Sequence, residues 1–316
     1  MKILVTGSDG LVGRAVRRIA EQHPDHEYVF ATRKTCDLTD RGAVFSLFED
    51  ELPDVVVHLA AKVGGLFYNL ANHTEMYRAN VEMNSNVIDA SVAYGVVKCF
   101  VCLSTCIFPD TEKGEFTEAD LHMGAPHWSN YGYAVAKRYA EVLASKYMDH
   151  DKCATSFHFL APTNLYGPED NFRELQSHVV PALIRRAHTM WCSESDSGLS
   201  VRGDGTPLRQ FLYVDDLAKI LMTLVEEAGP LPRTMIVAPS EEYTIRQLAE
   251  TVCDAATLPK ISLVFTGGAN GQARKYASNS LLMSLPCMKG FEFTSLGDGI
   301  ARTMHWYSTH LTEARN

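Results

Sequence analysis

Short apolar runs alternate with amphipathic segments along the first half of the chain. The apolar runs predict strands at residues 2–6, 28–32, 55–60, 97–104 and 155–160. Apolar positions at helical spacing predict helices between these strands, at residues 11–21, 71–94 and 133–148. Strands that alternate with helices favour a parallel sheet that helices cover on both faces. The pattern therefore predicts an α/β fold with a doubly wound parallel sheet, in which ligands bind at the carboxyl ends of the strands.

The first predicted strand leads into a glycine-rich turn, and a helical pattern follows the turn. Glycines between a strand and a helix allow a tight turn and bring the backbone close to a pyrophosphate at the helix N-terminus. A plain strand-to-helix turn is the alternative, but the strand before and the helix after favour a Rossmann-like dinucleotide site. The residues expected to bind the cofactor at this turn are Gly7, Gly10, Leu11, Val12 and Gly13.

The second predicted strand ends just before two cations, Arg33 and Lys34. About twenty residues past the last glycine, an NAD-binding protein places an acidic residue on the ribose 2′-hydroxyl. Cations at this position suit a 2′-phosphate and favour NADP(H), although two solvated surface charges are the alternative interpretation. Asp37 is a candidate for the adenine side. The loops after the other strands are expected to complete the cofactor site with Ala60, Ala61, Leu103, Pro162, Asn164 and Leu165.

The pattern of the second half is looser. Residues 171–178 are expected to form a loop and residues 179–188 a helix, and residues 211–214 and 215–226 a strand and a helix that return to the main sheet. A further strand is expected at 234–237, and Thr244 and Gln247 fit a capping box that opens a helix to about residue 256. We therefore expect an NADP-binding Rossmann domain over residues 1–165, with a return segment at about 209–238. Residues 166–208 and 239–316 are expected to form a smaller C-terminal α/β lobe that binds the substrate.

Composition excludes several classes of function. The 316 residues carry a formal net charge of −9 and no dense run of Lys or Arg, which argues against binding to nucleic acid or anionic membranes. No run reaches the roughly 18 apolar residues of a membrane span. The eight cysteines are scattered, and Cys99 and Cys102 lie three apart on a predicted strand and so face opposite sides. We expect reduced thiols, no metal and a cytoplasmic location.

A tyrosine and a lysine stand four residues apart at the start of one predicted helix. At this spacing Tyr133 and Lys137 share a face, whereas Tyr131 points elsewhere. A nearby ammonium favours the phenolate form, so we expect the lysine to lower the pKa of the phenol towards neutrality. An amphipathic helix with an exposed lysine is the alternative. Ser104 follows a strand end, so that serine, tyrosine and lysine can converge on a nicotinamide held by the glycine turn.

These motifs together resemble the extended short-chain dehydrogenase/reductases and, more specifically, the GDP-L-fucose synthase family. The resemblance spans nearly the whole chain. It rests on the segments at residues 59–66, 103–109, 133–137, 162–172, 177–183 and 205–211. It implies an NADP(H)-dependent, bifunctional enzyme that inverts C3 and C5 of GDP-4-keto-6-deoxy-D-mannose and reduces C4 to form GDP-L-fucose.

The resemblance also implies residue roles. Ser104, Tyr133 and Lys137 serve the C4 oxygen, and Lys137 also binds the nicotinamide ribose. Cys106 and His178 act as the acid/base pair for the two inversions, and His178 lies at the cofactor as well. The positions implied for the substrate are Asn164, Arg186, Arg202, Arg209, Asn270 and Lys275.

Some positions depart from the family pattern and leave alternatives open. The family commonly has a tryptophan where this chain has Arg202 and an aspartate where it has Asn270, which puts the guanine and sugar contacts in doubt. Another nucleotide-sugar epimerase or dehydratase of the same class is the alternative function. A non-catalytic nucleotide sensor of this fold is a third, although Tyr133 and Lys137 are both present. The helices at 71–94 and 133–148 are candidates for pairing in a homodimer.

Overall fold

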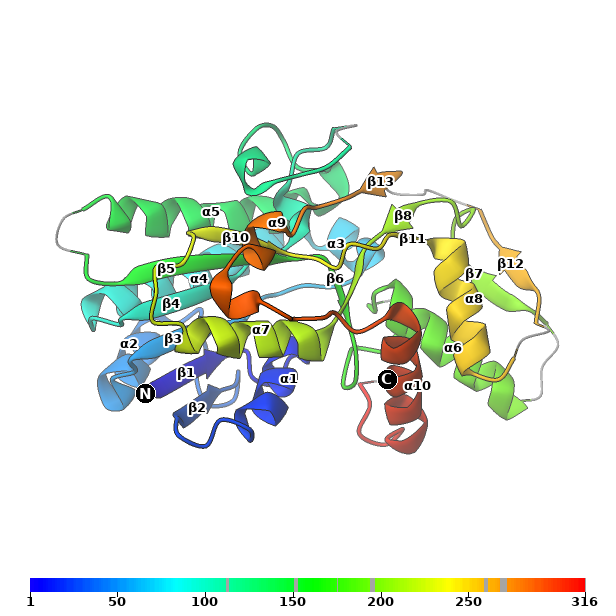
Figure 1. Ribbon diagram of the computed structural model, residues 1–316, viewed down its shortest axis with the longest axis horizontal. Helices are drawn as coiled ribbons and strands as arrows, with labels where there is room; N and C mark the ends of the chain where they lie inside the picture. The colour runs from blue at the N-terminus through cyan, green and yellow to red at the C-terminus, as the bar shows by residue number, and fades with distance from the viewer. Residues whose placement is uncertain are drawn as a thin grey trace.

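The computed structural model describes residues 1–111, 114–150, 153–174, 176–193, 197–258, 261–267 and 272–315. Its centre is a six-stranded sheet in the order β10-β5-β4-β3-β1-β2, with parallel pairing throughout (Figure 1). The strands are β1 (Lys2–Thr6), β2 (Glu27–Ala31), β3 (Val55–His58), β4 (Lys98–Cys102), β5 (Ser156–Pro162) and β10 (Thr234–Val237). The predicted fold class is confirmed.

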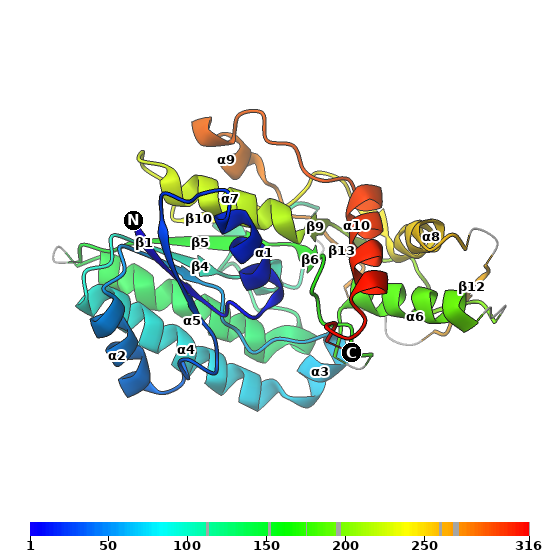
Figure 2. The ribbon, with the colours of Figure 1, turned by 90° about the horizontal axis from the view of Figure 1, so that it is seen from below.

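Helices cover both faces of this sheet (Figure 2). One face packs against α1 (Leu11–Ala20) and α7 (Val214–Glu226). The opposite face packs against α2 (Arg41–Glu51), α4 (His73–Ala93) and α5 (Tyr131–Met148). Because both faces are covered, a central strand such as β3 is buried at every position and is apolar without alternation until His58.

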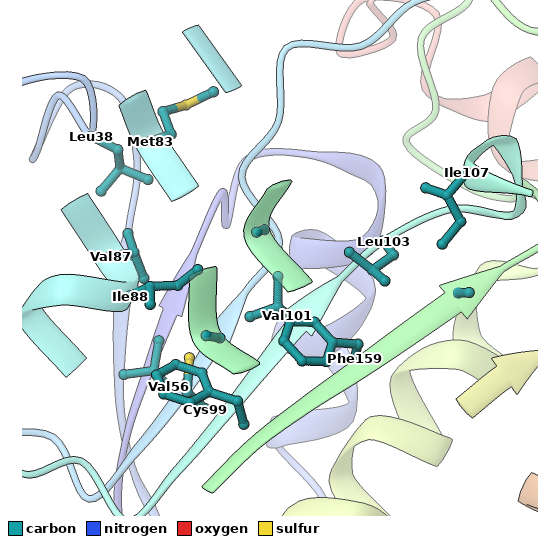
Figure 3. Close-up of a cluster of buried hydrophobic side chains, with 14 of the residues drawn as sticks. Leu38, Val56, Met83, Val87, Ile88, Cys99, Val101, Leu103, Ile107 and Phe159 are labelled. Carbon is teal, nitrogen blue, oxygen red and sulfur yellow. The ribbon is translucent and has the colours of Figure 1, made fainter. Parts of the chain in front are cut away.

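The core beneath α4 shows how the sheet is held (Figure 3). Side chains from the inner face of the helix lie against side chains from three neighbouring strands. The helix contributes Met83, Val87 and Ile88, the segment before α2 contributes Leu38, and the sheet contributes Val56, Cys99, Val101 and Phe159. Burying each large apolar side chain stabilises the fold by roughly 1.5–3 kcal/mol. This packing fixes the strand ends from which the site is built.

A smaller lobe follows the main sheet. Its core lies among α6 (Val179–Ser193), α8 (Ile245–Ala255) and α10 (Leu296–Thr309). Short strands complete the lobe and its junction with the main sheet: β6 (Asn164–Tyr166) with β9 (Phe211–Tyr213), β7 (Leu199–Val201) with β12 (Leu263–Phe265), and β11 (Tyr243–Thr244), β8 (Leu208–Arg209) and β13 (Arg274–Lys275). The remaining short helices are α3 (Leu66–Ala71), α9 (Ser280–Met283), η1 (Thr105–Ile107), η2 (Glu118–Asp120), η3 (Trp128–Asn130) and η4 (Pro286–Met288).

Several sequence-based boundaries need correction. The helix expected at 71–94 begins at His73, and the helix expected at 179–188 runs to Ser193 because its buried stripe continues through Met190. The strand expected at 97–104 ends at Cys102, which leaves Ser104 beyond the sheet.

Two further elements differ from the sequence analysis. The strand expected to return to the main sheet is β9, which pairs with β6 in a separate two-stranded sheet. Helix α2 was not predicted, because it buries only Val44 and Phe48 and therefore shows little helical periodicity. Its start is fixed instead by the Asp40 side chain, which accepts a hydrogen bond from the backbone N–H of Ala43. None of the described helices is long and apolar enough to span a membrane.

Candidate active site

A cavity of about 1160 Å³ opens at the carboxyl ends of the main strands and extends to the smaller lobe. Its wall includes the glycine turn, the loops after β3, β4 and β5, the start of α6 and part of β8 and β13. The structure thus gathers around one space the segments that the sequence analysis singled out separately. Two of the predicted residues are not among those that line it: Lys34 is exposed elsewhere, and Asn270 lies outside the described residues.

The glycine turn is shaped for close approach of a ligand. Gly7 has φ +69°, and a Cβ there would lie 2.7 Å from the backbone of Ala60. A Cβ on Gly13 would lie 2.4 Å from the carbonyl oxygen of Gly7. Gly10 caps α1 without a side-chain hydrogen bond, so the first N–H groups of this helix have no side-chain cap. Such a turn fits the pyrophosphate of a dinucleotide.

Two residues after β2 also line the cavity. Arg33 and Asp37 both line it, and both are exposed. The Asp37 carboxylate accepts hydrogen bonds from Thr39 N at 3.0 Å and Thr39 Oγ1 at 2.8 Å. These bonds, together with the charge of Arg33, lower the pKa of Asp37. The carboxylate is therefore engaged within its own loop, and Arg33 is the cation on this part of the wall.

Ser104, Tyr133 and Lys137 lie together where β4 meets α5. Ser104 Oγ accepts a hydrogen bond from Cys106 N at 3.2 Å and so caps η1. Lys137 is 1% exposed, and its Nζ donates to the carbonyl oxygen of Cys102 at 2.6 Å. Its Nζ lies 5.9 Å from the centre of the Tyr133 ring. The two residues share one face of α5, as their spacing predicted, and Tyr131 points away and is 49% exposed.

The expected lowering of the phenol pKa is wrong for this structure. Burial raises the pKa of Tyr133 well above its usual value, and the thiols of Cys102 and Cys106 add to the rise. Burial also lowers the pKa of Lys137. Removal from water is the main cause of both shifts, because burial disfavours the charged form of each group. Tyr133 is thus a protonated phenol, the form that can donate a proton.

Cys106 lies beside two cations of the smaller lobe. Burial lowers the pKa values of Arg209 and Lys275, and the thiol of Cys106 acts in the opposite direction on both. His178, just before α6, opens onto the same cavity. Its side chain is exposed to the cavity, and partial desolvation by the surrounding wall lowers its pKa. His178 is therefore neutral near pH 7, the form that can accept a proton.

The cations predicted for the substrate lie along the lobe side of the cavity. Arg186, Arg202, Arg209 and Lys275 all line it. Arg186 Nη1 donates to Ser200 O at 3.0 Å. Burial lowers the pKa of Arg186, and the nearby charge of Arg202 lowers it further. Like charges held this close together are suited to a multiply charged anion.

Asn164 lines the same cavity, near the boundary between the sheet and the lobe. Its Nδ2 donates to Gln210 O at 2.8 Å, which orients its amide group. The other predicted cofactor residues, Ala60, Ala61, Leu103, Pro162 and Leu165, also line the cavity.

The sequence analysis missed a set of polar groups on this wall. Their atoms are buried and have no hydrogen-bond partner among the described residues: Asn69 Oδ1, Thr163 Oγ1, Asp170 Oδ2, Ser177 Oγ, Gln272 Nε2 and Arg315 Nε. Unpaired buried polar atoms are rare in folded proteins, so their collection around one cavity fits a site that holds water or a polar ligand. No motif marks them, because they come from distant parts of the chain that only the fold brings together.

Comparison with known proteins agrees with this geometry. The profile of the NAD dependent epimerase/dehydratase family matches residues 3–238. A probable GDP-L-fucose synthase from Drosophila melanogaster is 38% identical, over 99% of each chain. The GDP-L-fucose synthase of Escherichia coli K12 is 33% identical, over 97% of this chain and 96% of its own.

Solved structures extend the likeness to three dimensions. A GDP-L-fucose synthetase from Naegleria fowleri bound to NADP superposes with a TM-score of 0.91 at 36% identity. The match covers 100% of this chain and 95% of that one. The resemblance inferred from the motifs is confirmed. The chain belongs to the NAD dependent epimerase/dehydratase family and, within it, to the GDP-L-fucose synthases.

Proposed function

We propose that the protein converts GDP-4-keto-6-deoxy-D-mannose to GDP-L-fucose with NADPH, by inverting C3 and C5 and reducing C4. One observation carries the proposal. The Ser104, Tyr133 and Lys137 set and the pair Cys106 and His178 line one cavity that also contains the glycine turn. Relatives that match over nearly their whole length carry the same activity in their names.

NADP(H) fits the adenosine and glycine-turn end of the cavity. The turn presents the start of α1, which has no side-chain cap, to the cavity, and Arg33 would meet the 2′-phosphate. The chemistry that this cofactor supplies is a hydride for the C4 carbonyl carbon. We assign its binding to residues 1–165 with the return segment at about 209–238, and the GDP-sugar to residues 166–208 and 239–316.

The residues at the sheet edge serve the C4 oxygen in both reactions. Removing a proton from C3 or C5 leaves an enolate whose negative charge rests on that oxygen. Ser104 and the protonated phenol of Tyr133 would donate hydrogen bonds to it, and such donors stabilise an oxyanion strongly in a buried site. Tyr133 then gives its proton to the oxygen during reduction of C4. A hydrogen bond to the carbonyl oxygen of Cys102 fixes the amino group of Lys137 beside this site.

The pair Cys106 and His178 would carry out the inversions. At each carbon one group takes the proton from one face and an acid returns a proton to the other. The neutral imidazole of His178 is ready to accept a proton. Arg209 and Lys275 lie on the same side as Cys106, and Arg186 and Arg202 would hold the diphosphate of the GDP-sugar.

Turnover tests the proposal directly. Purified protein is incubated with GDP-4-keto-6-deoxy-D-mannose and NADPH, and the product is identified by NMR. We expect GDP-L-fucose, with one NADPH oxidised per molecule formed. A product reduced at C4 but not inverted at C3 and C5 would remove the epimerase half of the proposal.

Proton exchange tests the thiol separately. With NADP⁺ in place of NADPH and with deuterated water, the wild-type protein should exchange the protons at C3 and C5. Cys106→Ser should slow this exchange about 10²-fold or more, the usual contribution of a positioned acid or base. Cys192→Ser is the matched control, because Cys192 is an exposed thiol that does not line the cavity. Equal exchange in both variants would exclude Cys106 from the mechanism.

We also propose a homodimer formed through α4, η3 and α5. Tyr77, Trp128 and Tyr131 are 41%, 64% and 49% exposed and line one shallow hollow of about 530 Å³ with Val135. Aromatic side chains gathered on a surface mark an interface, and a twofold axis pairs the same patch on both copies. Tyr131→Arg should shift the mass in sedimentation analysis towards the monomer, and an unchanged mass would contradict this interface.

A cytoplasmic location is also proposed, in keeping with eight free cysteines.

A further inference from the structure

An arginine far from every recognised motif reaches the cofactor end of the cavity. Arg315 follows α10, and its backbone is joined to the loop after β6: Phe172 N donates to Arg315 O at 2.9 Å. Its side chain is partly buried and lines the cavity. Its Nη2 donates to Glu169 O at 2.7 Å, whereas its Nε is buried and has no partner among the described residues. One edge of this guanidinium is therefore held and another is left for a ligand.

Glu169, whose carbonyl oxygen accepts the hydrogen bond from Arg315, also connects Arg315 to the glycine turn. Glu169 is bonded through its carboxylate to Arg14 and Arg18 on α1. Arg14 Nε in turn donates to Asp9 O, within the turn, at 3.1 Å. Glu169 has φ +64°, a strained conformation for a residue with a side chain, and such strain persists where surrounding contacts impose it, often at functional sites. The loop after β6 thus brings Arg315 close to the start of α1.

Electrostatics favours an anion beside Arg315. Burial lowers the pKa of Arg315, Asp170 and Glu169 raise it, and Arg14 and Arg173 lower it, so three cations and two carboxyl groups lie within electrostatic range of one another. The neighbouring Asp170 is 3% exposed, and its Oδ2 has no partner among the described residues. Burial raises the pKa of Asp170 to about 7, so near neutral pH this carboxyl is only partly ionised. It then neutralises its neighbours only in part and, when protonated, offers a donor.

We propose that Arg315 binds the diphosphate of the bound dinucleotide, alongside the N–H groups at the start of α1. The inference rests on the proposed cofactor and adds a contact from the opposite end of the chain. A bare glycine turn offers only backbone donors to this diphosphate, and here it also carries Asp9, whose negative charge opposes an anion. Arg14 on α1 is paired with Glu169, and Arg315 adds a second cation, whose planar guanidinium can donate two parallel hydrogen bonds to phosphate oxygens.

Binding measurements without any GDP-sugar test this contact. Dissociation constants for NADPH and NADH are measured by titration calorimetry or by competition. Arg315→Gln should weaken both dinucleotides by the same factor, roughly tenfold or more, because both carry the diphosphate. Arg33→Gln should weaken NADPH alone, because only NADPH carries the 2′-phosphate. Arg173→Gln removes an exposed charge close to Arg315 that does not line the cavity, so it should weaken both cofactors much less than Arg315→Gln does.

Two further variants separate binding from support of the fold. Asp170→Asn keeps the shape and removes the negative charge, so it should keep or raise both affinities. A loss equal to that of Arg315→Gln would show that the two side chains merely support the loop, and would overturn the proposal. If Arg315→Gln does not fold, Arg315→Lys decides, because it keeps the charge and loses the second hydrogen bond. It should weaken both dinucleotides several-fold, and wild-type affinities would overturn the proposal.

The ligand itself is tested by GDP. A loss of GDP affinity in Arg315→Gln, with dinucleotide affinities unchanged, would move the residue to the substrate and overturn the assignment. These affinities do not depend on turnover of any sugar. A protein that failed to make GDP-L-fucose but lost both dinucleotides in Arg315→Gln would contradict the proposed function and leave this contact standing.

Discussion

The two walls of the cavity are built in different ways. On the sheet side, Tyr133 and Lys137 are 7% and 1% exposed, and the lysine is bonded to the backbone at the end of β4. On the other side, His178 stands open to the cavity just before α6, and Cys106 lies between the sheet edge and cations of the smaller lobe. The proposed proton donor for C4 thus rests on the buried core, and the proposed acid/base pair lies where two parts of the molecule meet.

This difference suggests a division of tasks. Reduction needs one fixed distance between the hydride donor and C4, which a buried helix and sheet can hold. Inversion needs groups on both faces of the sugar ring, and a single rigid wall can reach only one face. The smaller lobe supplies the second face. Changes on the sheet side should therefore impair reduction and, through the C4 oxygen, proton exchange as well, and changes on the lobe side should impair proton exchange more than cofactor binding.

Tyr133→Phe gives the largest expected loss on the sheet side. Without the phenol proton, turnover measured by NADPH oxidation should fall about 10³-fold, within the range for a positioned general acid. NADPH affinity should remain close to that of the wild type, because Lys137 and the glycine turn are unchanged. Turnover within about tenfold of the wild type would mean that another group donates the proton.

His178→Gln should give the largest loss on the lobe side, about 10²-fold in deuterium exchange at C3 and C5. Burial lowers the pKa of His178, so the neutral base persists below pH 6.5 and exchange should fall only as the pH drops through this lowered pKa. In His178→Gln this fall of exchange at low pH, the acid limb of the pH profile, should be absent. His188→Gln is the control, since His188 lies on the same helix, α6, and does not line the cavity. An acid limb that persists in His178→Gln would assign it to another group.

The rigidity of the sheet side can be tested through His58, at the end of β3. Its ring is buried between Thr6 and Asn84, and burial lowers its pKa to about 3. The unfolded chain binds a proton there below pH 6.5 and the folded one does not, so stability is lost as the pH falls from 6.5 towards 3. The free energy of unfolding should drop by about 2 kcal/mol between pH 6.5 and 5 from this residue alone. In denaturant titrations, His58→Gln should reduce this pH dependence, and an equal slope would contradict the buried neutral ring.

The smallest effect is expected at Arg33, on the exposed rim. Arg33→Gln should weaken NADPH about tenfold relative to NADH, equivalent to about 1.4 kcal/mol. Salt should reduce the difference, because an exposed contact between charges is screened. Lys34→Gln is the matched control, because Lys34 does not line the cavity. Equal selectivity loss in both variants would show that overall charge, rather than a contact, sets the preference.

Local patterns were sufficient for much of this description. The glycine turn, the spacing of Tyr133 and Lys137 and the alternation of strands and helices each depend on residues close in sequence, and each is present in the structure. Boundaries were less certain where packing decides them, as in α6, whose buried stripe continues past the two arginines. The pairing of β9 with β6 could not be inferred, because two short apolar segments carry no signal of their partner.

The sequence by itself determined the fold class through local periodicity and the family through the resemblance of its motifs, and it named many of the residues that line the cavity. Only the tertiary structure decided the protonation of Tyr133, because the burial that raises its pKa comes from elements far along the chain. The same holds for the cations around Cys106 and for Arg315, which reaches the glycine turn from beyond α10. Desolvation and long-range charge depend on which residues the fold brings together, and no spacing along the chain records them.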